Sequence, residues 1–503
     1  MFEAFIQALA QIFQPAVFIA MMFGIVIAVV VGILPGLGGP AIIILTLPFI
    51  VGRDPLMCLA FMTVLISANC TAGSITAILI GVPGESSNAA AILDGFPMTR
   101  KGQGARAIGA ALTSSMMGGT VAVFLSFLMI PLVMPLLMQL RSPELFAVIL
   151  LGMCFLAVLA QDSAIKGLIS AGLGILFSCI GFQTKTGIER FTFGNPYLYD
   201  GIQVVVMLMG LLALPVLVEL VSAGKPIDAT DMSQVGTYKS LFRGALDVYN
   251  HWWLWLRSTV IGYIVGVIPG IGGETAVWVA YAHAKQTSKE PETFGTGNVE
   301  GVIAPQSATN ARQAGDMLTT LALGIPGGSS MVLILAAFIL LGIQPGPKLL
   351  VDHTSLSFAI LIIIALANII GAVLCVFFLP LCIKITRISP VYLFSLILPL
   401  IYIGVYVYNG FFIDLIVMLG ITVVGILLRK FKYSVPSLIL GFIMGRMFEY
   451  YLWQAIDFNG PTFFMTPISL ALLFVVFLVL TNKVWIRLWR KVRKQGQKGA
   501  TRS

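Results

Sequence analysis

The sequence predicts an all-α polytopic membrane protein, with about twelve transmembrane helices in two inverted-topology repeats whose helices break at Gly-Pro motifs. Three observations support this fold class. Hydrophobic residues make up 58% of the chain and charged residues only 10%, whereas charged residues are about 25% of soluble domains. Continuous apolar stretches of roughly 20 residues, enough to cross about 30 Å of hydrocarbon, recur along the chain. Two Gly-Pro motifs also occur twice each, in the same order.

The first duplicated motif follows an apolar run in each half. Residues 32–39 read GILPGLGG and residues 266–273 read GVIPGIGG, so five of eight positions are identical and the other three exchange Ile, Leu and Val. Proline lacks the N–H group and clashes with the preceding turn, while glycine lets the backbone turn. Each copy is therefore expected to break a membrane helix, as a discontinuous span or a re-entrant hairpin.

The second motif lies further along each half. Residues 81–87 read GVPGESS and residues 324–330 read GIPGGSS, which agree at five of seven positions. The offset between these copies is 243 residues, and that between the copies of the first motif is 234 residues. Two unrelated motifs in the same order, at nearly the same offset, indicate an internal duplication.

The rest of the chain divides around these motifs. Residues 1–14 have apolar side chains at helical spacing and are expected to lie on the membrane surface. We place the first repeat at residues 15–224, a polar connector at 225–250, the second repeat at 251–482 and a basic tail at 483–503. A polar region at residues 285–316 separates two apolar runs of the second repeat. The expected helical runs are residues 15–34, 41–51, 56–80, 107–137, 144–160, 164–182, 202–221, 252–268, 275–281, 331–341, 356–379, 391–408, 411–428, 435–445 and 461–480.

Basic residues indicate the orientation. From Lys483 onward the chain has eight Lys or Arg residues and no acid, which places the C-terminus in the cytoplasm under the positive-inside rule. Counting spans back from the tail puts the loop with Lys348 outside. Its counterpart in the first repeat, the loop with Arg100 and Arg106, is basic and expected inside. Corresponding loops then lie on opposite sides, so the repeats are expected to be inverted.

The helix starts after the four motifs form the expected substrate site. The first N–H groups of a helix lack intrahelical partners, and with the helix dipole they bind anions without a lysine or arginine. Irregular backbone at membrane depth must also face protein or a water-filled cavity. The expected substrate-binding residues are Gly38, Gly39, Ser86, Ser87, Asn88, Gly272, Gly273, Thr275, Ser329 and Ser330. In the alternative interpretation the serines only cap helices and the glycines only permit close packing, but duplication of the motifs favours a binding site.

Two acids, Glu85 and Glu274, stand where the other half has no acid. An acid at bilayer depth costs about 2.5–3.5 kcal/mol, and a helix N-terminus returns only about 0.3–1 kcal/mol. Each is therefore expected to face a wet cavity, to be protonated or to have a partner, unless it caps a helix near the interface. Oxygens that could hold a sodium ion belong to Asn69, Thr71, Asn310 and Thr320. Polar contact between helices is the alternative for these four, and the coupling ion is either Na⁺ or H⁺.

Other function classes gain no support from the sequence. The six cysteines include no Cys-x-x-Cys pair, which argues against a metal site or a disulfide framework. Neither a His-Glu-x-x-His, a Gly-x-Ser-x-Gly nor a Walker motif occurs, so we expect no enzyme, no cofactor and no ATP hydrolysis. Much of the net charge of +9 lies in the tail and does not indicate nucleic acid. An anion channel or a stand-alone ion-coupled carboxylate transporter remains the alternative function.

The duplicated motifs, the chain length and the basic tail resemble the large membrane subunit of the tripartite tricarboxylate transporter family. The resemblance spans residues 15–480 and is most specific at residues 266–275, GVIPGIGGET. It implies a multi-pass subunit of the bacterial inner membrane that works with a small membrane subunit and a periplasmic solute-binding protein. It also implies ion-driven uptake (symport) of citrate and other carboxylates. The sequence does not decide which carboxylate is carried.

Overall fold

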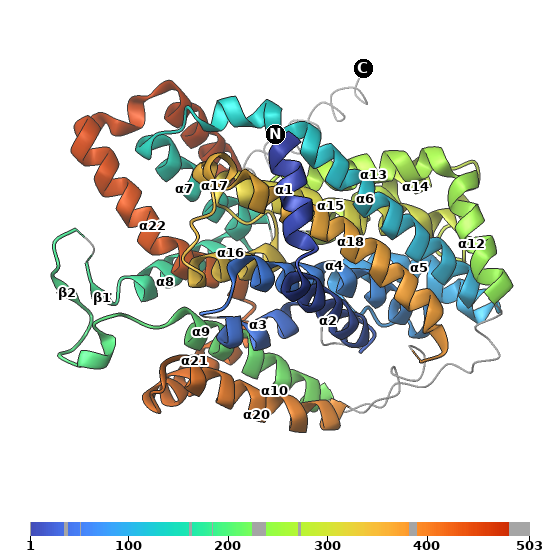
Figure 1. The fold of residues 1–503 in the computed structure, drawn as a ribbon, viewed down its shortest axis with the longest axis horizontal. Coiled ribbons are helices and arrows are strands. Elements are labelled where there is room, and N and C mark those ends of the chain that lie inside the picture. Colours follow the sequence, from blue (N-terminus) through green and yellow to red (C-terminus); the bar gives the residue numbers. More distant parts are fainter. Residues whose placement is uncertain are drawn as a thin grey trace, which may run out of the picture. The chain divides into compact units, whose positions relative to one another are not determined.

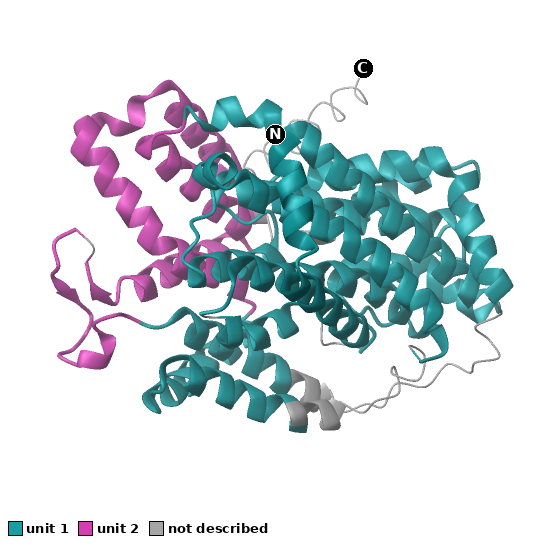
Figure 2. Ribbon diagram, viewed as in Figure 1, with its two compact units in different colours: residues 1–139, 202–431 teal, residues 140–201, 432–503 magenta. Residues whose placement is uncertain are grey.

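The computed structural model describes residues 2–34, 39–50, 52–159, 163–183, 185–223, 238–269, 273–381 and 390–481. These residues are almost entirely helical (Figure 1). The chain divides into two compact units (Figure 2), of which unit 1 comprises residues 1–139 and 202–431 and unit 2 comprises residues 140–201 and 432–503. Each unit combines segments that lie far apart in the sequence. The boundaries of the two expected repeats stay a prediction.

Unit 1 contains the helices that surround all four Gly-Pro motifs. In chain order they are α1 (Phe2–Ile12), α2 (Pro15–Gly32), α3 (Gly39–Ile50), α4 (Pro55–Ile80), η1 (Ser86–Asn88), α5 (Ala89–Arg100), α6 (Gly104–Leu137), α9 (Val204–Leu208), η3 (Met209–Ala213), α10 (Leu214–Ala223), α12 (Tyr238–Asn250), α13 (Trp252–Val267), α14 (Gly273–Thr287), η4 (Pro291–Thr293), α15 (Glu300–Leu323), α16 (Ser329–Leu340), α17 (Pro347–Asp352), α18 (Thr354–Phe377), α20 (Pro390–Asn409) and α21 (Ile413–Lys430).

Four helices of the described chain, α2, α4, α6 and α18, are long and apolar enough to cross a membrane. A fifth span results if two helical segments joined at a bend of 66° are counted together: Val435–Met465, which comprises α22 (Val435–Asn459) and η5 (Gly460–Met465), and Pro467–Thr481. These helices confirm the all-α membrane class. On α6, the apolar side chains at positions 124, 128, 132 and 136 form one exposed stripe at helical spacing, as expected of a face toward lipid.

The amphipathic N-terminal segment forms α1. Ala8 and Ile12 are fully buried, whereas Phe2 and Ile6 are exposed, so the helix has one face toward the protein. That face packs mainly against α18, and the Phe5 ring lies 5.8 Å from the ring of Phe127 on α6. The location of α1 on the membrane surface stays a prediction.

At the centre of unit 1 are two helices, α4 and α15, whose residues are buried on nearly all sides. α4 packs against α2, α5 and α18, and α15 packs against α6, α13 and α14. The expected polar region at residues 285–316 is therefore only partly a connector, because its second half belongs to the buried helix α15. Small residues of α15, among them Ala304, Ala308 and Ala311, are fully buried. Small residues let neighbouring helices approach closely, which explains how a helix of modest hydrophobicity occupies the interior.

Unit 2 contains α7 (Ser142–Leu159), α8 (Ala164–Ser178), η2 (Pro196–Leu198), α22 and η5 (Gly460–Met465). Its short antiparallel hairpin pairs β1 (Gly181–Phe182) with β2 (Glu189–Arg190). The guanidinium of Arg190 donates to both carboxylate oxygens of Glu449 at 2.9 and 2.8 Å. α22 ends at Asn459, 14 residues beyond the expected end at residue 445. The longer helix is explained by this contact, because the polar second half of α22 has a partner in the hairpin.

Candidate functional site

Many fully buried polar residues of unit 1 lie on α4 and α15, the helices before the second motif of each half. Asn69, Cys70 and Thr71 of α4 and Asn310 of α15 are 0% exposed, and Arg312 of α15 is 4% exposed. A charged side chain in a membrane interior costs about 2.5–3.5 kcal/mol on insertion scales, and such residues usually mark a functional site. We therefore take the surroundings of Arg312 as the candidate site.

Helices break at the positions that the motifs predict. α2 ends at Gly32 and α13 at Val267, directly before the first motif's Pro-Gly step. After α4, Gly81 has φ 68° and ψ 19°, and after α15, Gly324 has φ 70° and ψ 17°. This left-handed conformation is strained for residues with a side chain, so both corresponding positions need glycine. Their matching geometry agrees with the duplication inferred from the sequence.

One guanidinium connects the second breaks of the two halves. Arg312 Nη1 donates to Asp316 Oδ2 at 2.8 Å, one turn further along α15. Arg312 Nη2 lies 3.9 Å from Oε1 of Glu85, which belongs to the break of the first half. Gly328, in the break of the second half, also lies here, because a Cβ atom on it would stand 3.2 Å from Asp316 Oδ2. The two second motifs therefore meet at Arg312.

Glu85, one of the two acids that the sequence singles out, is thus buried with a cationic partner. The side chain is 8% exposed. Its second oxygen, Oε2, accepts a hydrogen bond from Cys70 Sγ at 2.6 Å. Glu85 precedes η1, but its side chain makes no capping hydrogen bond there, and its carboxylate faces a guanidinium and a thiol; its role in ion coupling stays a prediction.

Asn69 and Arg312 occupy corresponding positions, 243 residues apart. Each lies against the helix that precedes the first motif of its own half. A Cβ atom on Gly32 would stand 2.8 Å from Asn69 O, and a Cβ atom on Gly266 would stand 2.9 Å from Arg312 Cα. The two halves therefore repeat one close helix contact, made with the backbone of Asn69 in the first half and with the backbone of Arg312 in the second.

The side-chain amide of Asn69 is fully buried, and neither Oδ1 nor Nδ2 has a hydrogen-bond partner among the described residues. An unsatisfied buried polar group costs about 1–3 kcal/mol. Asn69 Oδ1 lies 3.3 Å from the position of a Cβ atom on Gly39, the first residue of α3. The buried amide of Asn69 therefore lies against the start of α3, where the first backbone N–H groups of a helix have no intrahelical partner.

The predicted serines have the same exposure in both halves. Ser86 and Ser329 are exposed, whereas Ser87 and Ser330 are buried. In each half one hydroxyl of the pair thus faces outward at the helix start and the other packs inward. Whether the outward pair contacts substrate stays a prediction.

Asn88 is bonded on both sides within the protein. Its Nδ2 donates to the backbone oxygen of Cys70 at 3.1 Å, and its Oδ1 accepts from Gln306 Nε2 at 3.0 Å. These bonds join α4 to α15, so the amide holds the two central helices together, and its predicted contact with substrate stays untested.

Two of the predicted ion-coupling residues are in direct contact. Asn310 Nδ2 donates to Thr71 Oγ1 at 2.7 Å and to Asn368 Oδ1 at 2.8 Å. Thr320 lies on a different turn of α15, where its hydroxyl donates to the backbone oxygen of Asp316 at 2.7 Å. The four residues Asn69, Thr71, Asn310 and Thr320 therefore do not form one cluster, because Asn69 faces α3.

Part of the predicted site falls on residues that the structure does not describe. Gly38, Gly272 and the side chain of Glu274 lie outside the described residues. Gly273 begins α14, and Thr275 in its first turn is exposed.

The sequence reasoning missed Arg312 and Asp316. Both lie in the region expected to be polar, where charged residues need no special explanation. A usable signal was their spacing of four residues, which places both on one helix face. A second signal was the duplication, since Arg312 corresponds to Asn69, a residue that the pattern did single out.

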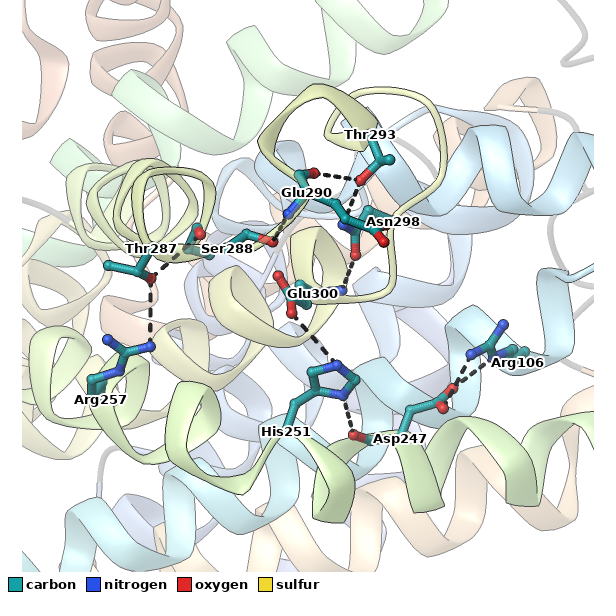
Figure 3. A network of polar contacts seen from close by, with 11 residues as sticks. Arg106, Asp247, His251, Arg257, Thr287, Ser288, Glu290, Thr293, Asn298 and Glu300 are labelled. Atoms are coloured by element: carbon teal, nitrogen blue, oxygen red, sulfur yellow. Dashed lines mark hydrogen bonds and ion pairs between the residues drawn. The ribbon is translucent and has the colours of Figure 1, made fainter.

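A separate polar network joins the ends of α6, α12, α13 and α15 (Figure 3). Arg106 Nε donates to Asp247 Oδ2 at 2.6 Å, and His251 Nε2 lies 3.5 Å from Glu300 Oε1. The network borders a pocket of about 510 Å³ lined by Asn250, His251, Leu254, Arg257, Thr287, Ser288, Lys289, Glu290, Asn298 and Glu300. The pocket has two acids, two strong bases and one histidine, so it offers little surplus positive charge for an anionic substrate. We interpret the network as a set of structural contacts that hold these helix ends together.

Comparison with known proteins adds a family match. The model of a family described as the tripartite tricarboxylate transporter TctA family matches residues 18–440. An uncharacterized 52.8 kDa protein in TAR-I ttuC' 3'region of Agrobacterium vitis is 32% identical over 457 residues, which cover 90% of each chain. An uncharacterized protein in TAR-II ttuC' 3'region of the same organism is 34% identical over 215 residues, 42% of this chain and 89% of that protein. No solved structure matches the chain.

Proposed function

Because the chain belongs to the tripartite tricarboxylate transporter TctA family, we propose that it is the large membrane subunit of an ion-driven importer of organic carboxylates such as citrate. Membership of a transporter family makes the chain a transport component and not an enzyme. In this proposal a periplasmic binding protein delivers the substrate and a small membrane subunit completes the complex. A gradient of Na⁺ or H⁺ supplies the energy.

The observation that supports this function best is the buried guanidinium of Arg312 between two helix breaks. Guanidinium groups bind carboxylates through two parallel N–H donors, and the bond is strong where water is excluded. Arg312 contacts the carboxylates of Asp316 and Glu85, so this guanidinium is already positioned to pair with carboxylate groups. A substrate carboxylate can replace Glu85, whose oxygen lies at the longer distance of 3.9 Å.

A second contact for the substrate comes from Asn69 and the start of α3. The amide has no partner among the described residues and faces Gly39. We assign it a second carboxylate or a hydroxyl group of the substrate, which would satisfy the buried amide. The outward-facing hydroxyls of Ser86 and Ser329 are proposed to contact the same molecule. Two separated polar contacts favour a substrate with more than one carboxylate.

The proposal extends to topology and location. We propose about twelve spans in two inverted repeats, in line with the duplicated helix breaks. The basic C-terminal tail lies in the cytoplasm of a bacterial cell, and the subunit resides in the inner membrane. Alternating access would then move one repeat against the other around Arg312.

Uptake of labelled citrate into cells tests this function. The chain is expressed with and without a candidate small subunit and a candidate binding protein, and Na⁺ and H⁺ gradients are imposed separately. Saturable uptake that needs the partners and one gradient is expected. A panel of other carboxylates follows if citrate is not taken up. The proposal is wrong if no member of the panel is transported, or if the chain passes an anion current that does not saturate.

A further inference from the structure

Among the described side chains, the cluster of Glu85, Arg312 and Asp316 contains two acidic groups and one basic group. Their exposed fractions are 8%, 4% and 2%, so water screens little of the excess negative charge. A buried carboxylate without a full counter-charge tends to neutralise itself by binding a proton or another cation. The cluster is therefore built to accept one further positive charge.

The two acids differ in their contact with the guanidinium. Asp316 accepts a direct hydrogen bond of 2.8 Å from Arg312, whereas the nearest Glu85 oxygen is 3.9 Å away. The other oxygen of Glu85 accepts from the neutral thiol of Cys70. Glu85 also lies in the extended segment between α4 and η1 and not within a helix. Glu85 is thus the acid that an incoming carboxylate displaces more easily.

The surroundings favour a proton over a metal ion at Glu85. α4 contributes the thiol of Cys70, which is a soft ligand and a poor one for Na⁺. α15 contributes Arg312, whose positive charge opposes a metal cation at the same carboxylate, and Asp316 behind it. From α5 and α14, Asp94 and Tyr281 hydrogen-bond to each other at 2.8 Å. The side chain of Glu274, also on α14, lies outside the described residues.

We propose that Glu85 is the carrier of the coupling proton and that Glu85 and the substrate carboxylate compete for Arg312. In the empty site the ionised Glu85 pairs with Arg312. When a substrate carboxylate takes its place, Glu85 binds one proton from the outer solution and becomes a neutral carboxyl group. Release of the substrate inside lets Glu85 return to Arg312 as its proton leaves to the cytoplasm. Counting only the substrate carboxylate that replaces Glu85, the charge around Arg312 is the same before and after binding, and one proton moves with each substrate.

This proposal rests on the proposed function and predicts a sign for the pH dependence. Protonation removes the competitor of the substrate, so affinity for a fully ionised carboxylate falls as the pH rises. Couplings between two ligands typically change affinity about 5- to 150-fold. Glu85→Gln cannot ionise and mimics the protonated state. Its citrate affinity at mildly alkaline pH, where citrate is fully ionised, is expected to exceed that of the wild type by about 5- to 150-fold and to change little with pH.

The test uses the full chain reconstituted in lipid and two readouts. Infrared difference spectra on addition of citrate should show the C=O stretch of a newly protonated carboxyl group in the wild type. The band should be absent in Glu85→Gln and present in Glu144→Gln, which changes another buried glutamate. A pH-sensitive dye in weak buffer should record about one proton taken up per citrate bound by the wild type and none by Glu85→Gln.

Two outcomes would overturn the proton proposal while leaving carboxylate transport intact. One is that the infrared band persists in Glu85→Gln. The other is that citrate binding requires Na⁺ and takes up no proton. The failures of the two proposals are distinguishable. If citrate binds with a proton uptake that Glu85→Gln abolishes, but no carboxylate of the panel is transported, the proton site stands and the proposed function fails.

Discussion

Neutralising Arg312 is the sharpest perturbation that the structure suggests. Arg312→Gln removes the positive charge shared by Glu85 and Asp316 but leaves both acids buried. A second variant, Arg312→Gln with Asp316→Asn, removes one acid together with the base and retains polar side chains of similar size. A third, Arg312→Lys, keeps the charge but loses the planar pair of donors.

The expected loss of stability follows from burial. Removing one partner of a buried ion pair costs about 3–5 kcal/mol, because the other charge is left uncompensated. Arg312→Gln should therefore lower the free energy of unfolding by about 3–5 kcal/mol. The double variant should recover most of this loss, since replacing a buried pair by neutral groups is often close to neutral.

The expected loss of function differs from the loss of stability. A hydrogen bond to a charged group is worth about 1.5–3 kcal/mol, which corresponds to a roughly 10- to 160-fold weaker affinity for the substrate carboxylate. The double variant, although folded, should show this loss in full. Arg312→Lys should retain part of the uptake, because an ammonium group attracts a carboxylate without the matching geometry.

Two assays separate these effects. Thermal unfolding of the purified chain can be followed with a thiol-reactive dye, because Cys58, Cys70, Cys154 and Cys375 are buried in the folded protein. Uptake of labelled citrate, corrected for the amount of chain in the membrane, gives the functional loss. The reasoning is refuted if the double variant unfolds like the wild type and also transports citrate within about twofold of it, far less than the 10-fold lower bound.

Three further variants test other parts of the site. Asn69→Leu removes the two buried amide atoms, Oδ1 and Nδ2, that have no partners among the described residues. It should therefore raise the free energy of unfolding by about 1–3 kcal/mol and lower the affinity for citrate. A stable variant with unchanged affinity would exclude Asn69 from the site. Ser86→Ala combined with Ser329→Ala should insert normally, because both side chains are exposed, and should reduce uptake; unchanged uptake would leave these serines a capping role only. Gly266→Ala places a methyl group 2.9 Å from Arg312 Cα and should destabilise the protein by about 1–3 kcal/mol. Gly420→Ala serves as its control, because a Cβ atom there has nothing within 4 Å. Equal unfolding temperatures for the two variants would contradict the close helix contact.

The fold class and the helix breaks were predictable because they depend on local chemistry. Long apolar runs can only be membrane helices, and a Pro-Gly step cannot continue a helix. The left-handed glycines at positions 81 and 324 follow from the same motif in both halves. Ends such as that of α22 were not predictable, because its polar second half depends on the partner Arg190, 259 residues away in the sequence.

The centre of the site was only partly predictable. Glu85 was recognised as an acid that needs a partner, but its partner lies 227 residues further along, since 312 − 85 = 227. Composition alone cannot distinguish a charged residue in a loop from one buried by neighbouring helices. The duplication could have identified Arg312 as a site residue, because Arg312 in the second half corresponds to Asn69 in the first half. A pattern search that compares the two halves residue by residue would find both.

The most direct test of the account is a structure of the reconstituted chain bound to a carboxylate for which uptake has been measured. The account predicts density for a substrate carboxylate within hydrogen-bonding distance of the Arg312 guanidinium, with Glu85 moved away and a second group near Asn69 and the start of α3. Substrate bound elsewhere, for example in the pocket beside His251 (Figure 3), with Arg312 still paired to both acids, would contradict it.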